Sequence, residues 1–410
     1  MSTILDAAIT LLLFVIVLGG LVLIHEVGHF VTARLARVRV LEFGVGFPPR
    51  AKVLRIGPAS AEDIERARRR READLEAAGD DTYLRDTILD QEPEVPTGTV
   101  YTLNWLPIGG FVKLEGEDGD EGDDPRSFSR ARLPVKLVIL AAGALMNLVL
   151  AFSIFTAIAW LATPYVGLKF ETVEPGSPAA TAGLRDGDAI ISIDGTQFEF
   201  YGDSAIDALR ARAGRTVTIG IIRADGNRDE VTATLRTQAE IDAGKGALGI
   251  RAGDNGFESL FYGEYTGRPL GDAAGIGASE TTRWFGLILA GLGDLAGSIV
   301  SDPTAAPPVS GPVGIATSLG EVFRGSGPIL TLYVAGILSA NLALVNILPF
   351  PPLDGGRMFV LILKAIPRYG PRISLRAERV TYAIGFVALF TFLIWITVFD
   401  IARQVGGGTP

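Results

Sequence analysis

The sequence predicts a polytopic α-helical membrane protein, with four transmembrane helices and a water-facing domain inserted between the second and the third. Hydrophobic residues make up 48% of the 410 residues and the mean hydropathy is +0.34, yet 20% of the residues are charged. A bundle of spans alone would carry fewer charges, so this mixture favours spans combined with a folded part outside the bilayer. The length leaves room for two or three such units.

Four apolar stretches have the length of a membrane span. Residues 4–24 are interrupted only by Asp6 and Thr10, and ~20 apolar residues cross a hydrocarbon core as a helix. This first stretch lacks the basic region and the small-residue cleavage site of a signal peptide, so we expect a retained span. The other three stretches are residues 133–161, 329–348 and 382–398.

A fifth apolar stretch, residues 287–300, is short and is interrupted by Asp294 and several glycines. We favour an interfacial or amphipathic helix there over a fifth span. An additional crossing would reverse the direction of the span that follows, so this choice decides on which side that span ends.

Basic residues predict the orientation. No Lys or Arg precedes Arg34, whereas basic residues follow the first span closely and are frequent between the third and fourth spans. Short loops rich in Lys and Arg stay in the cytoplasm. We therefore expect both basic segments to be cytoplasmic, and both termini and the long segment after the second span to lie outside.

The cytoplasmic segment after the first span has a β-like pattern over residues 38–56 and 99–114, with turn points at Gly44, Gly46, Gly109 and Gly110. Residues 59–90 between these stretches are strongly charged and helical in pattern, which indicates a solvated inserted helix, with nucleic-acid binding as a remote alternative. The acidic run at 115–124 is interpreted as a solvated loop. No basic footprint predicts a nucleic-acid partner.

Cysteine is absent and histidine occurs twice, which excludes disulfides, thiolate nucleophiles and cysteine-ligated zinc. Both histidines fall in the sequence His25-Glu26-Val27-Gly28-His29 at the end of the first span. Positions i and i+4 of a helix share a face, so both imidazoles can bind one metal ion, with Glu26 close enough to act as a general base. Polar groups at membrane depth are costly and mark functional sites. We predict a zinc site.

A catalytic zinc takes three protein ligands, and Asp354 is the best candidate for the third. With four spans, the first and third run in the same direction, so His25, His29 and Asp354 reach a similar depth on the cytoplasmic side. The prolines before Asp354 suit an unwound helix end that faces a cavity. The alternative is that Asp354 is a turn residue at a helix end.

The outer segment, residues 164–251, has the pattern of a small β-rich domain. Residues 190–195 alternate as a strand closed by a turn, residues 204–212 are helical, and strands at 217–222 and 230–235 flank an Asp225-Gly226 hairpin signal. This segment resembles a PDZ domain of the bacterial type. The resemblance implies binding of extended peptides by strand addition, and a spacer with a degenerate groove is the alternative.

The whole chain resembles the site-2 protease family of intramembrane metalloproteases, and most closely its bacterial regulator-of-sigma-E protease branch. The HExxH sequence in the first span and N-x-x-P-x-P-x-L-D-G at residues 346–355 carry the resemblance, together with residues 310–315 and 143–147. It implies Zn²⁺ held by His25, His29 and Asp354, with Glu26 as catalytic base. Asn346 would hold the substrate backbone. We group Asn147, Gly109 and Gly110 with it as substrate-binding candidates.

The resemblance also implies that residues 99–114 form a membrane-reentrant β segment, which pairs with an unwound substrate. The expected function is hydrolysis of peptide bonds in single-span membrane proteins, such as an anti-sigma factor or a signal-peptide remnant, in a bacterial inner membrane. Two features depart from that branch: one PDZ domain where two are common, and the charged insertion. A metal-binding transporter and a non-proteolytic PDZ scaffold are the other function classes considered.

The expected organisation along the chain follows from these elements. It comprises a first transmembrane helix (1–35), a cytoplasmic and reentrant β region (36–132), a second helix (133–162), the PDZ domain (164–251), an interfacial connecting segment (252–326), a third helix (327–356), a cytoplasmic loop (357–380) and a fourth helix (381–402).

Overall fold

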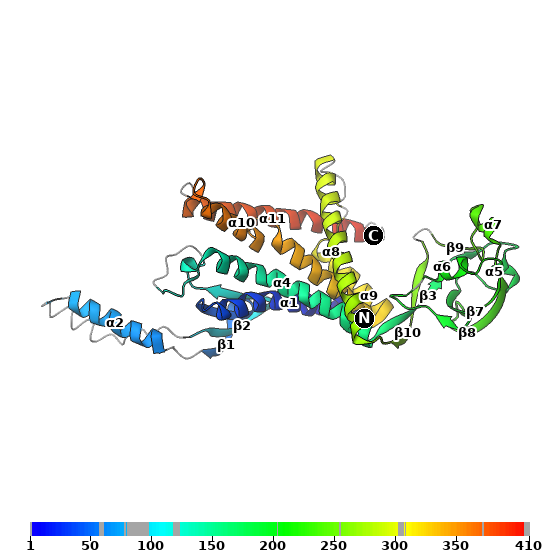
Figure 1. Ribbon diagram of the computed structural model, residues 1–410, viewed down its shortest axis with the longest axis horizontal. Helices are drawn as coiled ribbons and strands as arrows, with labels where there is room; N and C mark the ends of the chain where they lie inside the picture. Colours follow the sequence, from blue (N-terminus) through cyan, green and yellow to red (C-terminus); the bar gives the residue numbers. More distant parts are fainter. Residues whose placement is uncertain are drawn as a thin grey trace. The chain divides into compact units, whose positions relative to one another are not determined.

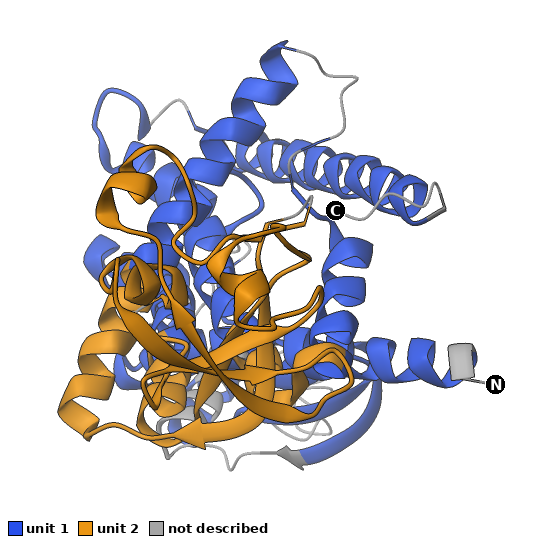
Figure 2. Ribbon diagram, turned by 90° about the vertical axis from the view of Figure 1, so that its right-hand side faces the viewer, with its two compact units in different colours: residues 1–151, 283–324, 334–410 blue, residues 152–282, 325–333 orange. Residues whose placement is uncertain are grey.

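The computed structural model describes residues 2–56, 61–77, 79, 98–117, 124–202, 204–253, 256–301, 307, 309–370 and 373–405. The chain forms two compact units (Figure 2). Unit 1 contains residues 1–151, 283–324 and 334–410, and unit 2 contains residues 152–282 and 325–333. Unit 1 is mainly helical, whereas unit 2 is built around a β-sheet.

Within the described residues, five helices are long and apolar enough to cross a membrane. They are α1 (Ser2–Leu35), α4 (Leu133–Leu161), α8 (Leu270–Ser301), α9 (Pro312–Ile347) and α11 (Leu375–Val405), all labelled in Figure 1. The sequence predicted four. The additional candidate is α8, because the short apolar stretch at 287–300 continues a helix that already begins at Leu270 and is 32 residues long.

The third predicted span corresponds to the second half of α9. This helix breaks at Gly327, whose φ of 77° is left-handed, and Pro328 follows. Glycine adopts this conformation without strain, and proline cannot donate the hydrogen bond that would continue the preceding helix. The part after the break therefore forms a separate straight segment, which ends at Ile347 and leads through a proline-rich loop to α10 (Asp354–Ala365).

The predicted cytoplasmic β segment is formed by the antiparallel strands β1 (Val40–Ile56) and β2 (Val100–Leu114), here called the β1–β2 hairpin, which packs against α1. Residues 42–45 of β1 pair with β2 on both sides, at 100–103 and at 110–113. The charged insertion between the strands forms α2 (Ala61–Ala77). The rest of that predicted helix, up to residue 90, lies outside the described residues except for Gly79. A short 3-10 turn, η1 (Phe128–Arg130), precedes α4.

The acidic run at 115–124 is not a solvated loop at its two ends. Arg39 contacts both Glu115 (3.2 Å) and Asp124 (3.1 Å), and Asp124 is 3% exposed. Arg357 pairs with Glu117. The prediction was wrong for these three acids because their arginine partners are distant in the sequence.

Unit 2 contains an antiparallel sheet in the order β10-β3-β5-β7-β8, with β6 paired to β5. The β5, β7, β8 and α6 elements confirm the predicted strands and helix. A strand that was not predicted, β10, lies within the expected connecting segment at 252–326 and pairs with β3, so the sheet extends beyond residue 251. The elements are β3 (Thr163–Lys169), β4 (Thr172–Val173), α5 (Pro178–Thr181), β5 (Ala189–Ile193), β6 (Thr196–Gln197), α6 (Ala205–Arg210), β7 (Thr216–Ile222), β8 (Arg228–Thr234), α7 (Gln238–Asp242), β9 (Ile250–Arg251) and β10 (Glu258–Thr266).

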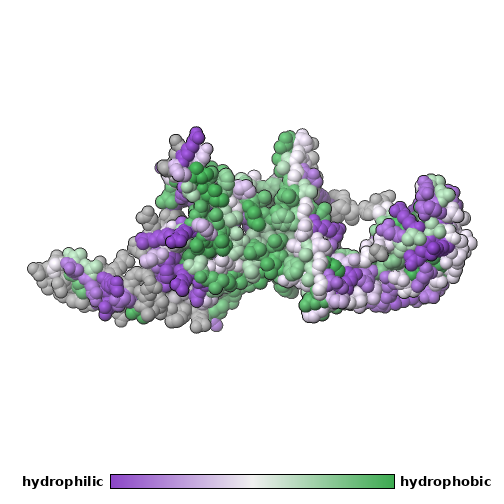
Figure 3. Space-filling view, in the orientation of Figure 1, coloured by the Kyte–Doolittle hydropathy of each residue, from purple (hydrophilic) through white to green (hydrophobic). Residues whose placement is uncertain are grey.

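The core of unit 2 is formed by apolar side chains of alternate strand positions, among them Ile190, Ile219 and Ile221, which are fully buried. Hydrophobic residues cover much of the helical part of unit 1 in Figure 3, although the visible face of α8 is largely pale, whereas α2 and the sheet of unit 2 carry many hydrophilic residues. The helices therefore have the surface of lipid-exposed segments, and the sheet has the surface of a water-facing domain.

Candidate metal centre

The two histidines lie on one face of α1, which continues as a helix from the apolar stretch through Leu35. Their Nε2 atoms are 3.1 Å apart, and both side chains are buried, with exposures of 6% for His25 and 8% for His29. The i, i+4 spacing on an unbroken helix produces this convergence. The predicted helical context of the motif is confirmed.

Asp354 completes the cluster from the far end of the chain. Its Oδ2 atom lies 2.9 Å from Nε2 of His25 and 3.2 Å from Nε2 of His29. Asp354 is the first residue of α10, directly after the loop that leaves α9. The structure thus brings together the three residues that the sequence singled out, and one ligand atom from each lies within 4.8 Å of the others.

Helix α4 packs directly against the two histidines of this cluster. A Cβ atom on Gly143 would lie 2.4 Å from His29 Nε2 and 2.7 Å from His25 Nε2, distances that real Cβ atoms do not adopt. The Nδ1 atom of His29 lies 2.8 Å from the backbone oxygen of Ile139, also on α4. Glycine therefore leaves room beside the two imidazoles, and a backbone carbonyl orients one of them.

These residues fit a zinc ion. Two imidazoles and one carboxylate are a ligand set of catalytic zinc sites, which leave the fourth position open. The space that a Cβ atom of residue 143 would fill lies directly beside both Nε2 atoms. Convergence of three metal-binding groups in an apolar helical unit would be costly without a cation between them.

Glu26 lies beside the cluster, and its Oε2 atom accepts a hydrogen bond from the backbone N–H of Val112 at 3.0 Å. Val112 is on β2, so the hairpin fixes the position of this carboxylate. A cavity of about 380 Å³ opens onto Glu26, His29 and Asp354. Its remaining lining is mostly apolar and comprises Phe47, Phe111, Val112, Leu114, Glu117, Ile139, Leu140, Pro352 and Arg357.

Sequence reasoning missed Glu117 and Arg357. Burial alone would lower the pKa of the Arg357 guanidinium, but the charges of Glu117 and Asp354 raise this pKa above its ordinary value. Arg357 follows Asp354 by three residues on α10, so helical spacing could have placed it on the same face. No sequence pattern pointed to Glu117.

The substrate-binding candidates lie in different environments. Within the described residues the Asn346 side chain has no hydrogen-bond partner, and it is half-buried near the end of α9. The side-chain amide of Asn147 is buried against His25. Gly109 and Gly110 let β2 approach α1, because a Cβ at these positions would lie 2.5 Å from Val22 Cγ1 and 3.1 Å from Leu23 Cδ1.

Together, the helical unit and the His-His-Asp cluster with its adjacent carboxylate define a membrane-embedded metal-dependent hydrolase. Comparison with known proteins specifies this class. The family model described as Peptidase family M50 matches residues 13–55 and 93–392. The chain belongs to Peptidase family M50, the site-2 protease family, and is an intramembrane zinc metalloprotease.

Relatives match over most of their length. A Clostridium perfringens protein with the provisional name of zinc metalloprotease is 29% identical over 384 residues, which are 93% of this chain and 96% of the relative. The zinc metalloprotease RasP of Geobacillus kaustophilus is 26% identical, over 95% of this chain and 97% of its own. A chloroplastic protein of Arabidopsis thaliana, provisionally named a membrane metalloprotease, is 24% identical over 94% and 78%.

Proposed function

We propose that this protease hydrolyses peptide bonds within the transmembrane segments of single-span membrane proteins, with His25, His29 and Asp354 as zinc ligands and Glu26 as general base. The observation that carries this proposal is the position of Glu26. It lies on the wall of the cavity that also contains His29 and Asp354, so a water molecule and a scissile carbonyl can meet there.

When bound, zinc supplies Lewis acidity, which polarises a carbonyl and lowers the pKa of a water molecule. The chain's own residues do the rest. Glu26, held by the Val112 N–H, takes the proton of the attacking water and passes it to the leaving amine. The apolar lining residues Phe47, Phe111 and Leu114 suit apolar substrate side chains.

A helical substrate must unwind before cleavage, because its carbonyls are engaged in intrahelical hydrogen bonds. Residues 42–45 of β1 pair with β2 on both sides, so residues 50–56 and 110–114 are the outer strand segments of this sheet in the described part of the chain. β-strand addition to one of these segments would replace the lost bonds. Several side chains near its tip are apolar and exposed, including Trp105 at 70% and Leu106 at 51%, which suits a membrane-reentrant segment. In this arrangement Asn346, Gly109 and Gly110 would contact the substrate backbone.

Four of the five long helices would cross the bilayer. Lys364 near the end of α10 pairs with Glu378 near the start of α11, so α11 begins at the metal-centre end of unit 1. Its Asp400, near the opposite end, accepts hydrogen bonds from the N–H groups of Gly311 and Gly314 at the start of α9.

The chain therefore enters α9 at the end of unit 1 opposite the metal centre. Helix α4 begins at the metal-centre end, where Ile139 contacts His29, and is long enough to reach that opposite end. A single crossing by α8 between these two points would return the chain to the wrong side. Helix α8 thus suits the predicted interfacial position.

The same geometry supports the predicted orientation. Arg34 in the last turn of α1, Arg37 just after this helix and Lys364 on α10 lie at the metal-centre end. The excess of basic residues in short loops marks the cytoplasmic side. The termini and the sheet of unit 2 are then extracytoplasmic, in a bacterial inner membrane. Unit 2 would act as a PDZ domain that binds peptides by strand addition and filters substrates, such as an anti-sigma factor or a signal-peptide remnant.

The proposal is tested with the full chain in proteoliposomes that contain a single-span model substrate. Glu26→Gln should retain zinc and lose at least ~100-fold in cleavage rate, because it removes the general base. Asp354→Ala should lose zinc as well as cleavage. Substantial cleavage by Glu26→Gln, or unchanged zinc content in Asp354→Ala, would refute the corresponding assignment.

A further inference from the structure

The second ring nitrogen of each zinc-binding histidine faces α4. Nδ1 of His29 lies 2.8 Å from the backbone oxygen of Ile139. A carbonyl oxygen can only accept a hydrogen bond, so this Nδ1 carries the proton and leaves Nε2 free to bind a metal. His29 therefore has the tautomer that zinc ligation through Nε2 requires.

His25 faces a side chain in the equivalent position. Its Nδ1 atom lies 3.4 Å from Nδ2 of Asn147, whose side chain is fully buried. In this orientation the Asn147 amide would donate a hydrogen bond to Nδ1 of His25. The proton of the neutral His25 ring would then be on Nε2, the atom that faces His29 and Asp354. That tautomer is incompatible with zinc binding through Nε2.

The Asn147 amide also has an unsatisfied atom. Its Oδ1 is buried and has no hydrogen-bond partner among the described residues. An unpaired buried acceptor is costly. Because the oxygen and nitrogen of an amide have nearly the same shape, their assignment follows from the hydrogen-bond network. Rotation of the amide by half a turn would place Oδ1 at Nδ1 of His25.

We propose that Asn147 is a positioning residue for the zinc ligand His25, and that its amide oxygen accepts the Nδ1–H of that imidazole. One rotation then satisfies the unpaired oxygen and fixes the tautomer in which Nε2 of His25 binds zinc. This role differs from the substrate contact expected for Asn147, and Asn147 is not part of the cavity lining. The inference rests on the zinc-ligand assignment proposed above.

The backbone around Asn147 is held as well. Ser339 on α9 donates a hydrogen bond from its hydroxyl to the backbone oxygen of Asn147 at 2.7 Å, and both residues are fully buried. Because α9 leads through a loop to Asp354, this hydrogen bond connects α4, which carries Asn147, to the helix that precedes the Asp354 carboxylate. Hydrogen-bond partners of this kind orient a metal ligand and raise its basicity.

Two substitutions distinguish the two amide orientations. Asn147→Leu removes the acceptor and should weaken zinc binding about 10–100-fold, measured by competition with a chromophoric chelator in detergent. Asn147→Asp supplies an acceptor without a donor and should bind zinc at least as tightly as the unsubstituted protein. If Asn147→Asp is as weak as Asn147→Leu, or if Asn147→Leu binds zinc normally, the inference is overturned.

The matched control is Asn104→Leu. Asn104 is also buried, and its Oδ1 also lacks a partner among the described residues, but its amide donates to the Gly46 backbone oxygen in the hairpin. This variant should keep its zinc affinity. His25→Ala tests the ligand assignment separately. If His25→Ala binds zinc normally, the proposed ligand set fails. If His25→Ala loses zinc while Asn147→Leu binds zinc normally, only the role of Asn147 is overturned.

A second measurement needs no substitution at Asn147. The chain has two histidines, so the ¹⁵N spectrum of an untagged, zinc-loaded Glu26→Gln protein contains four ring nitrogens. The expected spectrum shows a protonated Nδ1 and a metal-bound Nε2 for both residues. A His25 ring whose Nδ1 carries no proton would overturn the proposed hydrogen bond.

Discussion

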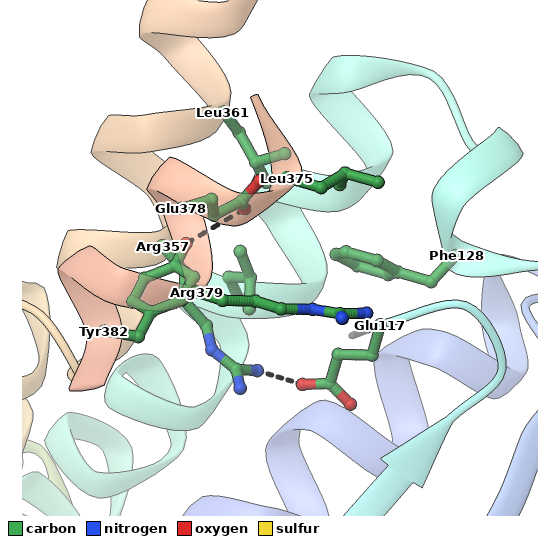
Figure 4. A pocket seen from close by; sticks show the side chains of 9 residues that line it. Glu117, Phe128, Arg357, Leu361, Leu375, Glu378, Arg379 and Tyr382 are labelled. Carbon is green, nitrogen blue, oxygen red and sulfur yellow. Dashed lines mark hydrogen bonds and ion pairs between the residues drawn. The ribbon is translucent and has the colours of Figure 1, made fainter. Parts of the chain in front are cut away.

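The Arg357 guanidinium and the Glu117 carboxylate form an ion pair on the wall shared by two cavities. One cavity contains the metal centre. The other, about 410 Å³, lies between α4, α10 and α11, and Figure 4 shows Arg357 and Glu117 joined at its edge. Arg357 is half-buried, and Glu117 is less exposed than its partner, so each group depends on the other for its charge compensation.

Breaking this pair should lower stability. Arg357→Gln or Glu117→Gln alone leaves a partly buried charge unpaired, so a double-mutant cycle of unfolding free energies in bicelles should give a coupling of about 0.5–3 kcal/mol. The exposed pair Lys169–Glu258 provides the control, for which about 0.2–1 kcal/mol is expected. Equal coupling energies for the two pairs would contradict the structural role assigned to Arg357 and Glu117.

Gly143→Ala should abolish zinc binding, because the added methyl group would overlap both Nε2 atoms. The zinc content of the purified protein measures the effect, which should be a loss of most of the bound metal. Gly20→Ala on α1 is the control, since a Cβ atom there meets nothing within 4 Å. Normal zinc content in Gly143→Ala would show that α4 can move away from the histidines.

The parts of this protein that the sequence predicted well depend on local pattern. Three features could be recognised from residues close together in the sequence. They are the continuous apolar residues of α1 and α4, the turn glycines of the hairpin and the HExxH spacing. Asp354 was singled out because, with four predicted spans, the first and the third run in the same direction and end at a similar depth. The contact of Asp354 with His25 at 2.9 Å confirms that inference.

The parts that were missed depend on partners far away in the chain. The extent of α8 was underestimated because only residues 287–300 were recognised as apolar, whereas the helix begins at Leu270 and its first half contains Glu280. In the structure the Tyr333 hydroxyl donates a hydrogen bond to this carboxylate, and Glu280 is 8% exposed. Glu117 was assigned to a solvated run for the same reason, since nothing near it indicates Arg357.

The hairpin should lose protection in acid. Burial of the Glu42 carboxylate alone would raise its pKa, but hydrogen bonds from Arg50 and Thr102 hold it below the ordinary value. Because the pKa of Glu42 is lower in the folded state than in the unfolded state, its ionised carboxylate stabilises the hairpin. This stabilisation is complete above about pH 4.3 and is lost as the pH falls through the folded-state pKa.

Hydrogen exchange of β1 and β2 in metal-free protein measures this loss without a contribution from zinc release. Glu42→Gln should exchange faster at neutral pH and should lack the acid-dependent change. Glu72→Gln on α2 is the control, because its carboxylate is exposed and pairs within its own helix. A hairpin that responds to acid equally in both variants would refute the role of Glu42.

Asp400 should stabilise the start of α9 from outside that helix. Gly311 is the residue before the first turn and has no side chain to accept the free backbone N–H groups. Asp400, 3% exposed, accepts from the N–H of Gly311 at 3.2 Å and from the N–H of Gly314 at 2.8 Å. A carboxylate at a helix N-terminus is favoured both by these bonds and by the helix dipole.

Asp400→Ala should therefore lower the unfolding free energy by about 1–3 kcal/mol, since the buried N–H of Gly311 and the partly buried N–H of Gly314 lose their acceptor. Asp400→Asn keeps one acceptor oxygen and should lose less. Zinc content should be unchanged in both variants, because this helix start is at the end of unit 1 opposite the metal centre. Thr391→Ala on α11, the helix that carries Asp400, is the control, because among the described residues its hydroxyl bonds only to the Val387 backbone oxygen. If Asp400→Ala and Thr391→Ala have the same free energy of unfolding, α9 needs no hydrogen-bond acceptor from α11.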